Sequence, residues 1–187
     1  NNKGLLEPSE VHKIGEDFYD EADSKVETGK IEKMSKSKKN VVDPNDIIDS
    51  YGADTARWFM LSDSPPDRDL QWSETGIVSS YRFLNKVWDF VSKYNNYKSD
   101  KNDVDVINNF KILINSVTEN IEQFQFNKSV AKIYEFVNLL NEVVTEKSIS
   151  KEGFGWSLCK LSLILQPFVP HISEEMWSSL KNDSFCI

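Results

Sequence analysis

The sequence predicts a mainly α protein, an antiparallel helix bundle preceded by a short irregular or β segment and a lysine-rich loop. Apolar residues recur at three- and four-residue spacing in successive segments beyond Trp72. Short connections that carry proline, glycine or polar residues separate these segments. The first 32 residues lack that periodicity. We therefore expect three parts, at residues 1–32, 33–72 and 73–187.

The chain ahead of the bundle is expected to hold one short strand and two short helices. Asp43 and Pro44 predict a helix start, because aspartate accepts from the free amides of a first turn and proline needs no donor there. Gly52 is typical of a helix end. The predicted elements are a strand at residues 25–28, helices at 44–51 and 54–61, and a proline-containing turn at 62–67.

The bundle itself is expected to contain five helices. Ser73 and Asn127 are the candidate N-caps of the first and third of them, and Pro167 stops the fourth. Gly153 and Gly155 predict that the connection before the fourth helix is a loop, at residues 146–155. The five predicted helices span residues 73–94, 104–123, 128–145, 156–165 and 170–180.

Composition limits the function classes. Of the 187 residues 39% are hydrophobic and 12% aromatic, which excludes wholesale disorder. The net charge of -8 argues against a general nucleic-acid binder, so any RNA contact must be local. Cys159 and Cys186 lack zinc-ligand spacing, and no apolar run is long enough to span a membrane, so we expect a cytoplasmic protein. The chain begins with Asn1 rather than Met, and we expect it to be a piece of something longer.

The lysine-rich loop is the strongest candidate for chemistry. Lysines on a mobile loop can move onto a triphosphate as negative charge builds on the leaving pyrophosphate. Ser35 and Ser37 add hydroxyl donors for phosphate oxygens, and Lys36 is the best single candidate for the residue that closes on them. The alternative is an ordinary solvated surface loop, because lysine-rich loops are common.

Several stretches resemble one family. The run Lys33-Met34-Ser35-Lys36-Ser37 is similar, letter for letter, to the second signature of the class I aminoacyl-tRNA synthetases. The residues after it, including Asp43-Pro44 and Tyr51-Gly52-Ala53-Asp54, resemble the continuation of that signature. Residues 57–72 resemble the leucyl branch rather than the valyl, isoleucyl or methionyl branches, and residues 126–131 and 165–177 are similar to the helical domain that ends its central body.

The resemblance implies a two-step reaction. Leucine attacks the α-phosphate of ATP to give leucyl-adenylate, and the acyl group then passes to tRNA(Leu). The implied substrates are ATP, with Mg²⁺ alongside it, and leucine, whose pocket would lie outside this chain. Lys36 and Lys33 would be the catalytic residues, and Lys33, Met34, Ser35, Lys36 and Ser37 would bind ATP. Residues 1–32 would come from the end of the catalytic region, and no metal site is expected.

The sequence also departs from the family. The first signature, His-Ile-Gly-His or a near variant, is missing, since His12 and His171 stand alone, and no pattern able to form the nucleotide-binding sheet is present. We therefore expect the chain alone to be inactive. Two alternatives stay open. In the first, the chain is part of another class I synthetase, valyl or isoleucyl. In the second, it is a stand-alone helical RNA-binding or assembly module.

Residues in the predicted helices offer further candidates. Arg82 and Lys86 lie four apart on one helix face, where they could contact tRNA phosphates or form an ordinary solvated face. His171 follows a proline at a helix start and is expected to have a structural capping role. Asp54 and Arg57 could form a local ion pair, and the tryptophans are expected in the core.

Overall fold

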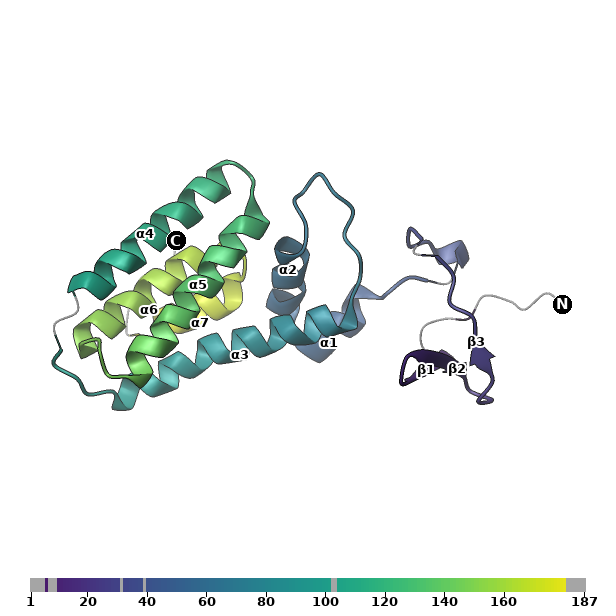
Figure 1. Cartoon of the computed structure of the whole chain (residues 1–187), viewed down its shortest axis with the longest axis horizontal. Helices are drawn as coiled ribbons and strands as arrows, with labels where there is room; N and C mark the ends of the chain where they lie inside the picture. Colours follow the sequence, from purple (N-terminus) through teal and green to yellow (C-terminus); the bar gives the residue numbers. More distant parts are fainter. Residues whose placement is uncertain (1–5, 7–9, 31, 39, 102–103, 181–187) are drawn as a thin grey trace. The chain divides into compact units, whose positions relative to one another are not determined.

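The computed structural model describes residues 6, 10–30, 32–38, 40–101 and 104–180. The chain forms two compact units, Asn1–Asp46 and Ile47–Ile187. The elements run in the order β1, β2 and β3, then a short 3₁₀ turn, η2, and then helices α1 to α7 (Figure 1).

The first unit contains a three-stranded antiparallel sheet in the order β1-β2-β3. Its strands are β1 (Val11–Ile14), β2 (Asp17–Asp20) and β3 (Lys25–Val26), and Gly15 takes a φ of 65° in the two-residue turn between β1 and β2. The predicted strand at residues 25–28 is shorter in the structure. The first two strands were not predicted, because four residues are too few to establish an alternating pattern.

A lysine ties β3 to β2 in this sheet. The Lys25 ammonium lies 2.7 Å from the Asp17 carboxylate. This hydrogen bond, reinforced by the negative charge of Asp17, raises the pKa of Lys25 above its usual value. Both side chains are exposed, so the pair fixes the position of a short strand more than it stabilises the fold.

The second unit contains the predicted helix bundle together with α2, which was predicted to lie ahead of the bundle. Helix α1 (Pro44–Tyr51) spans the boundary between the units, and the later helices belong to the second unit alone. In Figure 1, α4, α5 and α6 lie side by side with α3 along one side of them. The remaining bounds are α2 (Ala53–Ser62), α3 (Glu74–Asn96), α4 (Val104–Glu122), α5 (Phe126–Thr145), α6 (Lys151–Leu165) and α7 (Pro170–Ser179).

Two of the three predicted N-caps are confirmed. The Asp43 carboxylate accepts from the Asn45 amide at 2.8 Å, and the Ser73 hydroxyl accepts from the Gly76 amide at 3.1 Å. The cap at Asn127 is wrong, because α5 already begins at Phe126. The Phe126 ring packs against the core, and the carbonyl of the preceding residue, Gln125, accepts the first two helical hydrogen bonds.

The predicted loop at residues 146–155 is wrong in its second half, because α6 begins at Lys151. Ser150 caps the helix by accepting from the Gly153 amide at 2.8 Å. Gly155 lies against α3, where an added Cβ would come within 2.8 Å of the Tyr94 hydroxyl oxygen. Both glycines are therefore helical, and Gly155 serves the close approach of two helices rather than a turn.

One hydrophobic core runs through the helical unit. Trp58 is fully buried in it, as expected, and stacks on Phe83 with ring centroids 4.8 Å apart. Its indole N–H donates to the Tyr134 hydroxyl at 3.3 Å. Tyr97 is buried as well and donates to the Ile149 carbonyl at 2.9 Å, and burial raises its pKa. None of the helices in the described ranges combines the length and apolar character that crossing a membrane requires.

Helix α2 holds the turn between α6 and α7 through two oppositely charged side chains. The Asp54 carboxylate accepts from the Ile172 amide at 2.7 Å and the His171 amide at 3.4 Å, and the His171 ring nitrogen Nδ1 lies 2.8 Å from it. Arg57 donates to the carbonyls of Phe168 at 2.8 Å and Pro167 at 2.9 Å. The negative charge of Asp54 thus meets the N-terminus of α7, and the positive charge of Arg57 meets two carbonyls of the turn that follows α6.

This arrangement corrects two expectations. Asp54 and Arg57 do not pair with each other but contact opposite sides of the same turn. His171 is not the capping group of α7, because Asp54 supplies the cap and the His171 amide and ring are its partners. Sequence spacing favoured the local pair since the two residues are three apart on one helix, whereas their true partners lie 110 to 118 positions away.

Replacing Asp54 with alanine tests the weight of this cap. We expect Asp54→Ala to lower the free energy of unfolding by about 1–3 kcal/mol, because two amides at the α7 N-terminus lose their acceptor. Chemical denaturation followed by circular dichroism measures the change. Asp89→Ala, at an exposed position on α3, is the matched control, and equal stability of the two variants would contradict the role of Asp54.

Replacing Gly76 tests the contact between α2 and α3. An alanine Cβ there would lie 2.6 Å from a ring carbon of Phe59, which is 4% exposed and packs edge-on against Trp72. We expect Gly76→Ala to destabilise the protein by about 1–3 kcal/mol despite the better helix propensity of alanine. Thermal unfolding checks this against Ser79→Ala, an exposed position on the same helix, and a Gly76→Ala variant as stable as that control would refute it.

Candidate functional site

The candidate site is the signature loop, residues 33–40, in the first unit. Its centre is η2 (Lys36–Lys38), a single 3₁₀ turn in which the Lys38 amide donates to the Ser35 carbonyl at 3.1 Å. Lys36 opens this turn and is exposed, as is Lys33. The structure therefore presents both predicted catalytic lysines to solvent on one short loop.

Asn40 connects the two ends of the loop. Its side-chain oxygen accepts from the Ser35 amide at 2.8 Å, and its side-chain nitrogen donates to the Lys33 carbonyl at 3.4 Å. An amide side chain can make both bonds because it carries a donor and an acceptor. Asn40 was not predicted from the sequence as a site residue. The available signal was the turn preference of asparagine, which does not identify its partners.

The loop's charged and hydroxyl groups divide into two sets. Lys38 forms an ion pair with Glu32, whereas within the part of the chain that the structure describes no ion pair involves Lys33 or Lys36. The hydroxyl oxygens of Ser35 and Ser37 lie 3.0 Å apart. Two exposed ammonium groups beside two hydroxyls suit the oxygens of a polyphosphate.

Side chains of the kinds that bind metal ions are scattered rather than grouped. Across the described ranges, no three or more histidine, cysteine, aspartate or glutamate side chains gather in an arrangement that could hold a metal ion. The cationic groups of the signature loop are lysines.

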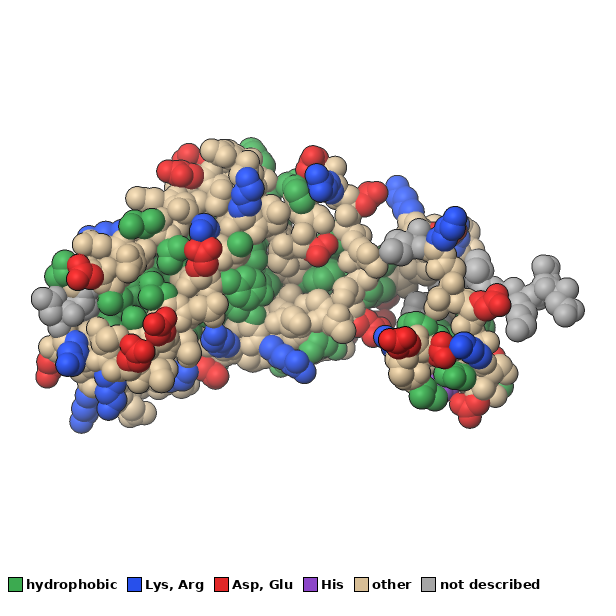
Figure 2. Space-filling view, in the orientation of Figure 1, with side chains coloured by type: hydrophobic (Ala, Val, Ile, Leu, Met, Phe, Trp, Pro, Cys, Tyr) green, Lys and Arg blue, Asp and Glu red, His purple; other side chains and the backbone are tan. Residues whose placement is uncertain are grey.

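The two predicted tRNA contacts lie in the helical unit, on α3. Arg82 is exposed. The Lys86 ammonium donates to the side-chain oxygen of Asn138 on α5 at 3.1 Å, so it also links two helices. Figure 2 shows acidic and basic side chains interspersed over the visible face of this unit. The role of Arg82 and Lys86 in binding RNA stays a prediction.

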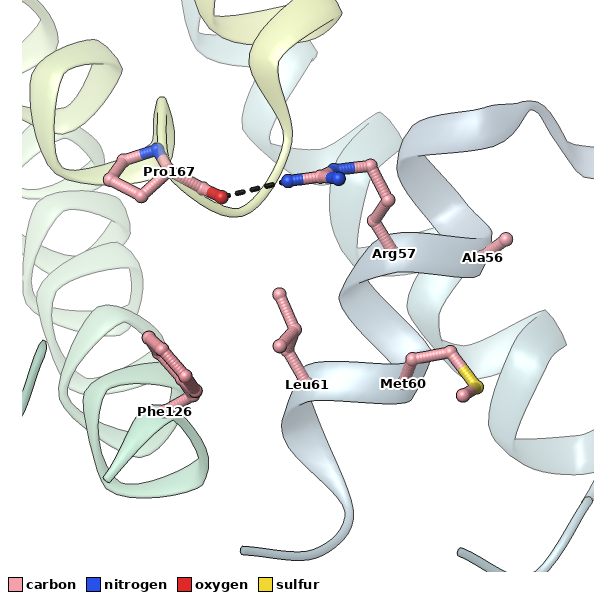
Figure 3. A pocket seen from close by; sticks show the side chains of 6 residues that line it. All are labelled: Ala56, Arg57, Met60, Leu61, Phe126 and Pro167. Carbon is pink, nitrogen blue, oxygen red and sulfur yellow. Dashed lines mark hydrogen bonds between the residues drawn. The ribbon is translucent and has the colours of Figure 1, made fainter. Parts of the chain in front are cut away.

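A pocket of about 490 Å³, which was not predicted from the sequence, opens on the helical unit. Figure 3 shows Arg57 reaching across its rim to the Pro167 carbonyl, with Phe126 and Leu61 facing the space below. The lining is largely apolar, and Met60 at its edge is 54% exposed. An apolar side chain fits this lining better than a phosphate does.

Two models of known protein families match parts of this chain. A family model described as tRNA synthetases class I (I, L, M and V) matches residues 22–73, which include the signature loop. A second, described as the anticodon-binding domain of tRNA ligase, matches residues 103–187. The two matched segments are therefore similar to class I tRNA synthetases.

Curated leucine–tRNA ligases are similar to most of this chain. The chain is 42% identical over 181 residues to the leucine–tRNA ligase of Zymomonas mobilis, covering 96% of this chain and 21% of the relative. It is 45% identical over 155 residues to that of Sphingopyxis alaskensis, covering 83% and 18%. For the Bartonella tribocorum enzyme the identity is 37%, covering 96% and 22%. The chain thus spans about a fifth of the length of these relatives.

A solved structure shares the fold. The crystal structure of a ternary complex of Agrobacterium radiobacter K84 LeuRS, tRNA and LeuAMS matches with a TM-score of 0.70 and 28% sequence identity. The match covers 82% of this chain and 21% of that one. The predicted fold class is confirmed: a helix bundle of the synthetase type follows a small β segment along the chain. The leucyl branch that residues 57–72 indicated is also the one to which these relatives belong.

Proposed function

We propose that this chain supplies the ATP-closing loop and the tRNA-docking helices of a leucine–tRNA ligase. The observation that carries the proposal is the signature loop. This loop lies inside the segment matched by the synthetase family model. Lys36 is exposed on the 3₁₀ turn that the Lys38–Ser35 hydrogen bond closes, and Lys33 is exposed just before that turn. The leucine pocket and the nucleotide-binding sheet would be contributed by other parts of the enzyme, so the chain alone is expected to be inactive.

In the first step the carboxylate of leucine attacks the α-phosphorus of ATP. The bond between this phosphorus and the bridging oxygen breaks, and pyrophosphate leaves with the bonding electrons. Negative charge therefore builds on the β- and γ-phosphates, with Mg²⁺ accompanying them. Lys36 and Lys33, with Ser35 and Ser37 donating, would stabilise that charge more strongly in the transition state than in the bound substrate.

In the second step a hydroxyl of the terminal ribose of tRNA(Leu) attacks the carbonyl carbon of leucyl-adenylate, an ester bond forms, and AMP leaves with the electrons of the broken bond. The tRNA would dock on the helical unit. Arg82 and Lys86 are the proposed phosphate contacts, and residues 33–72 and 73–187 the proposed functional segments. The leucine relatives favour the leucyl assignment over a valyl or isoleucyl one and over a stand-alone RNA-binding module. A cytoplasmic location is part of the same proposal.

A chimeric enzyme tests the proposal. This chain replaces the matching segment of the Zymomonas mobilis leucine–tRNA ligase, to which it is 42% identical. We expect the chimera to catalyse leucine-dependent pyrophosphate exchange, and Lys36→Ala to lower the rate by about 10²- to 10³-fold, as for loss of one transition-state donor. Stability should change little, because Lys36 is exposed.

The matched control is Lys30→Ala, an exposed lysine that precedes the signature loop, and its exchange rate should stay within about twofold of the unmodified chimera. Normal exchange in Lys36→Ala would refute the role of the loop. A second chimera, in the Bartonella tribocorum enzyme, guards against a misfolded host. Two chimeras that unfold cooperatively yet show no exchange would refute the assignment itself.

Binding of tRNA by the chain alone is expected to be weak, because the net charge is -8. Fluorescence anisotropy with labelled tRNA(Leu) measures it across salt concentrations. We expect Arg82→Ala to weaken binding further and to lower the slope of log affinity against log salt by about one contact. Arg68→Ala, an exposed arginine in the turn after α2, is the control. Tight binding that ignores salt would contradict the expectation.

A further inference from the structure

The signature loop is held in shape by one side chain that belongs to none of the predicted catalytic positions. The side-chain oxygen of Asn40 accepts a hydrogen bond from the Ser35 amide at 2.8 Å, and its side-chain nitrogen donates one to the Lys33 carbonyl at 3.4 Å. We propose that Asn40 is a positioning residue for leucine activation, which acts by fixing the backbone ahead of Lys36. The inference rests on the proposed function of the loop.

The two bonds of Asn40 lie directly ahead of Lys36 in the chain. They hold the backbone on both sides of Met34. Ser35, whose amide is bound by Asn40, also accepts a hydrogen bond at its carbonyl from the Lys38 amide, and this bond closes η2. Asn40 is half-buried, whereas Lys33, Met34 and Lys36 are exposed. We call the two hydrogen bonds of the Asn40 side chain the brace. The brace therefore lies in the less solvated part of the loop, and Lys33 and Lys36 lie in its exposed part.

An asparagine suits this task for a chemical reason. The two groups it meets are a backbone donor and a backbone acceptor, and an aspartate could satisfy only the first. A neutral amide also adds no negative charge that would compete with phosphate for the lysines. Lys38 forms an ion pair with Glu32, whereas Lys33 and Lys36 are exposed lysines that form no ion pair within the described part of the chain.

The brace has a kinetic consequence. Ordering one flexible residue costs about 1–2 kcal/mol of conformational entropy, and a loop already closed on itself has lost much of that freedom before ATP arrives. Without Asn40 the loop would have to be ordered in the transition state. The turnover number should then fall while the Michaelis constant for leucine, whose pocket lies elsewhere, stays constant.

A double-mutant cycle in the chimera separates positioning from a purely structural role. We expect Asn40→Ala to lower the turnover number of pyrophosphate exchange by about 10- to 100-fold. In a Lys36→Ala background the same change should cost less than about threefold, because the brace then has no lysine to position. Asn45→Ala, at an exposed asparagine in the first turn of α1, is the matched control and should stay within about twofold.

The outcomes distinguish this inference from the proposed function. Exchange by Asn40→Ala equal to that of the control, or equal losses with and without Lys36, would overturn the positioning role while leaving the loop assignment intact. An unaffected Lys36→Ala would instead refute the proposed function. Thermal unfolding of Asn40→Ala is measured alongside. A loss of turnover explained wholly by unfolded enzyme would also overturn the inference, because the active fraction would then show unchanged kinetics.

Discussion

The helical unit depends on how α2 holds the turn between α6 and α7. Asp54 and Arg57 approach that turn from one side, and each meets the backbone groups whose partial charge is opposite to its own. Trp58, which comes directly after Arg57, is fully buried beneath the same contact. Since α2 follows α1, and α1 follows the signature loop, the chain just beyond the loop is anchored to residues more than 110 positions later.

The sequence predicted the helices because their apolar spacing repeats over many residues. It failed where a contact from elsewhere in the fold decided a boundary. Asn127 is a good N-cap by type, yet α5 begins at Phe126, two residues before the predicted start, and the partly buried Phe126 ring packs against the core. Gly155 is typical of a loop, yet it lies in α6 where Tyr94 comes too close for a side chain. Local propensity carries no information about either neighbour.

The candidate site shows the same division between local and tertiary information. The five signature residues were found from the sequence because their order is distinctive. Asn40 was not, since its importance depends on which backbone groups of a folded loop come within reach of its amide. Asp54 and Arg57 were recognised as a charged pair but given the wrong partners, because spacing along a helix reports only neighbours on that helix.

The hydrogen bond between Lys86 and Asn138 has an electrostatic consequence of its own. Lys38 lies against a carboxylate, which carries a negative charge, whereas Lys86 lies against an amide oxygen, which carries no formal charge. Lys86 has therefore already surrendered rotational freedom while remaining a full monovalent cation. The hydrogen bond from α3 to α5 therefore favours one position of this ammonium on the surface of the bundle before any anion approaches it.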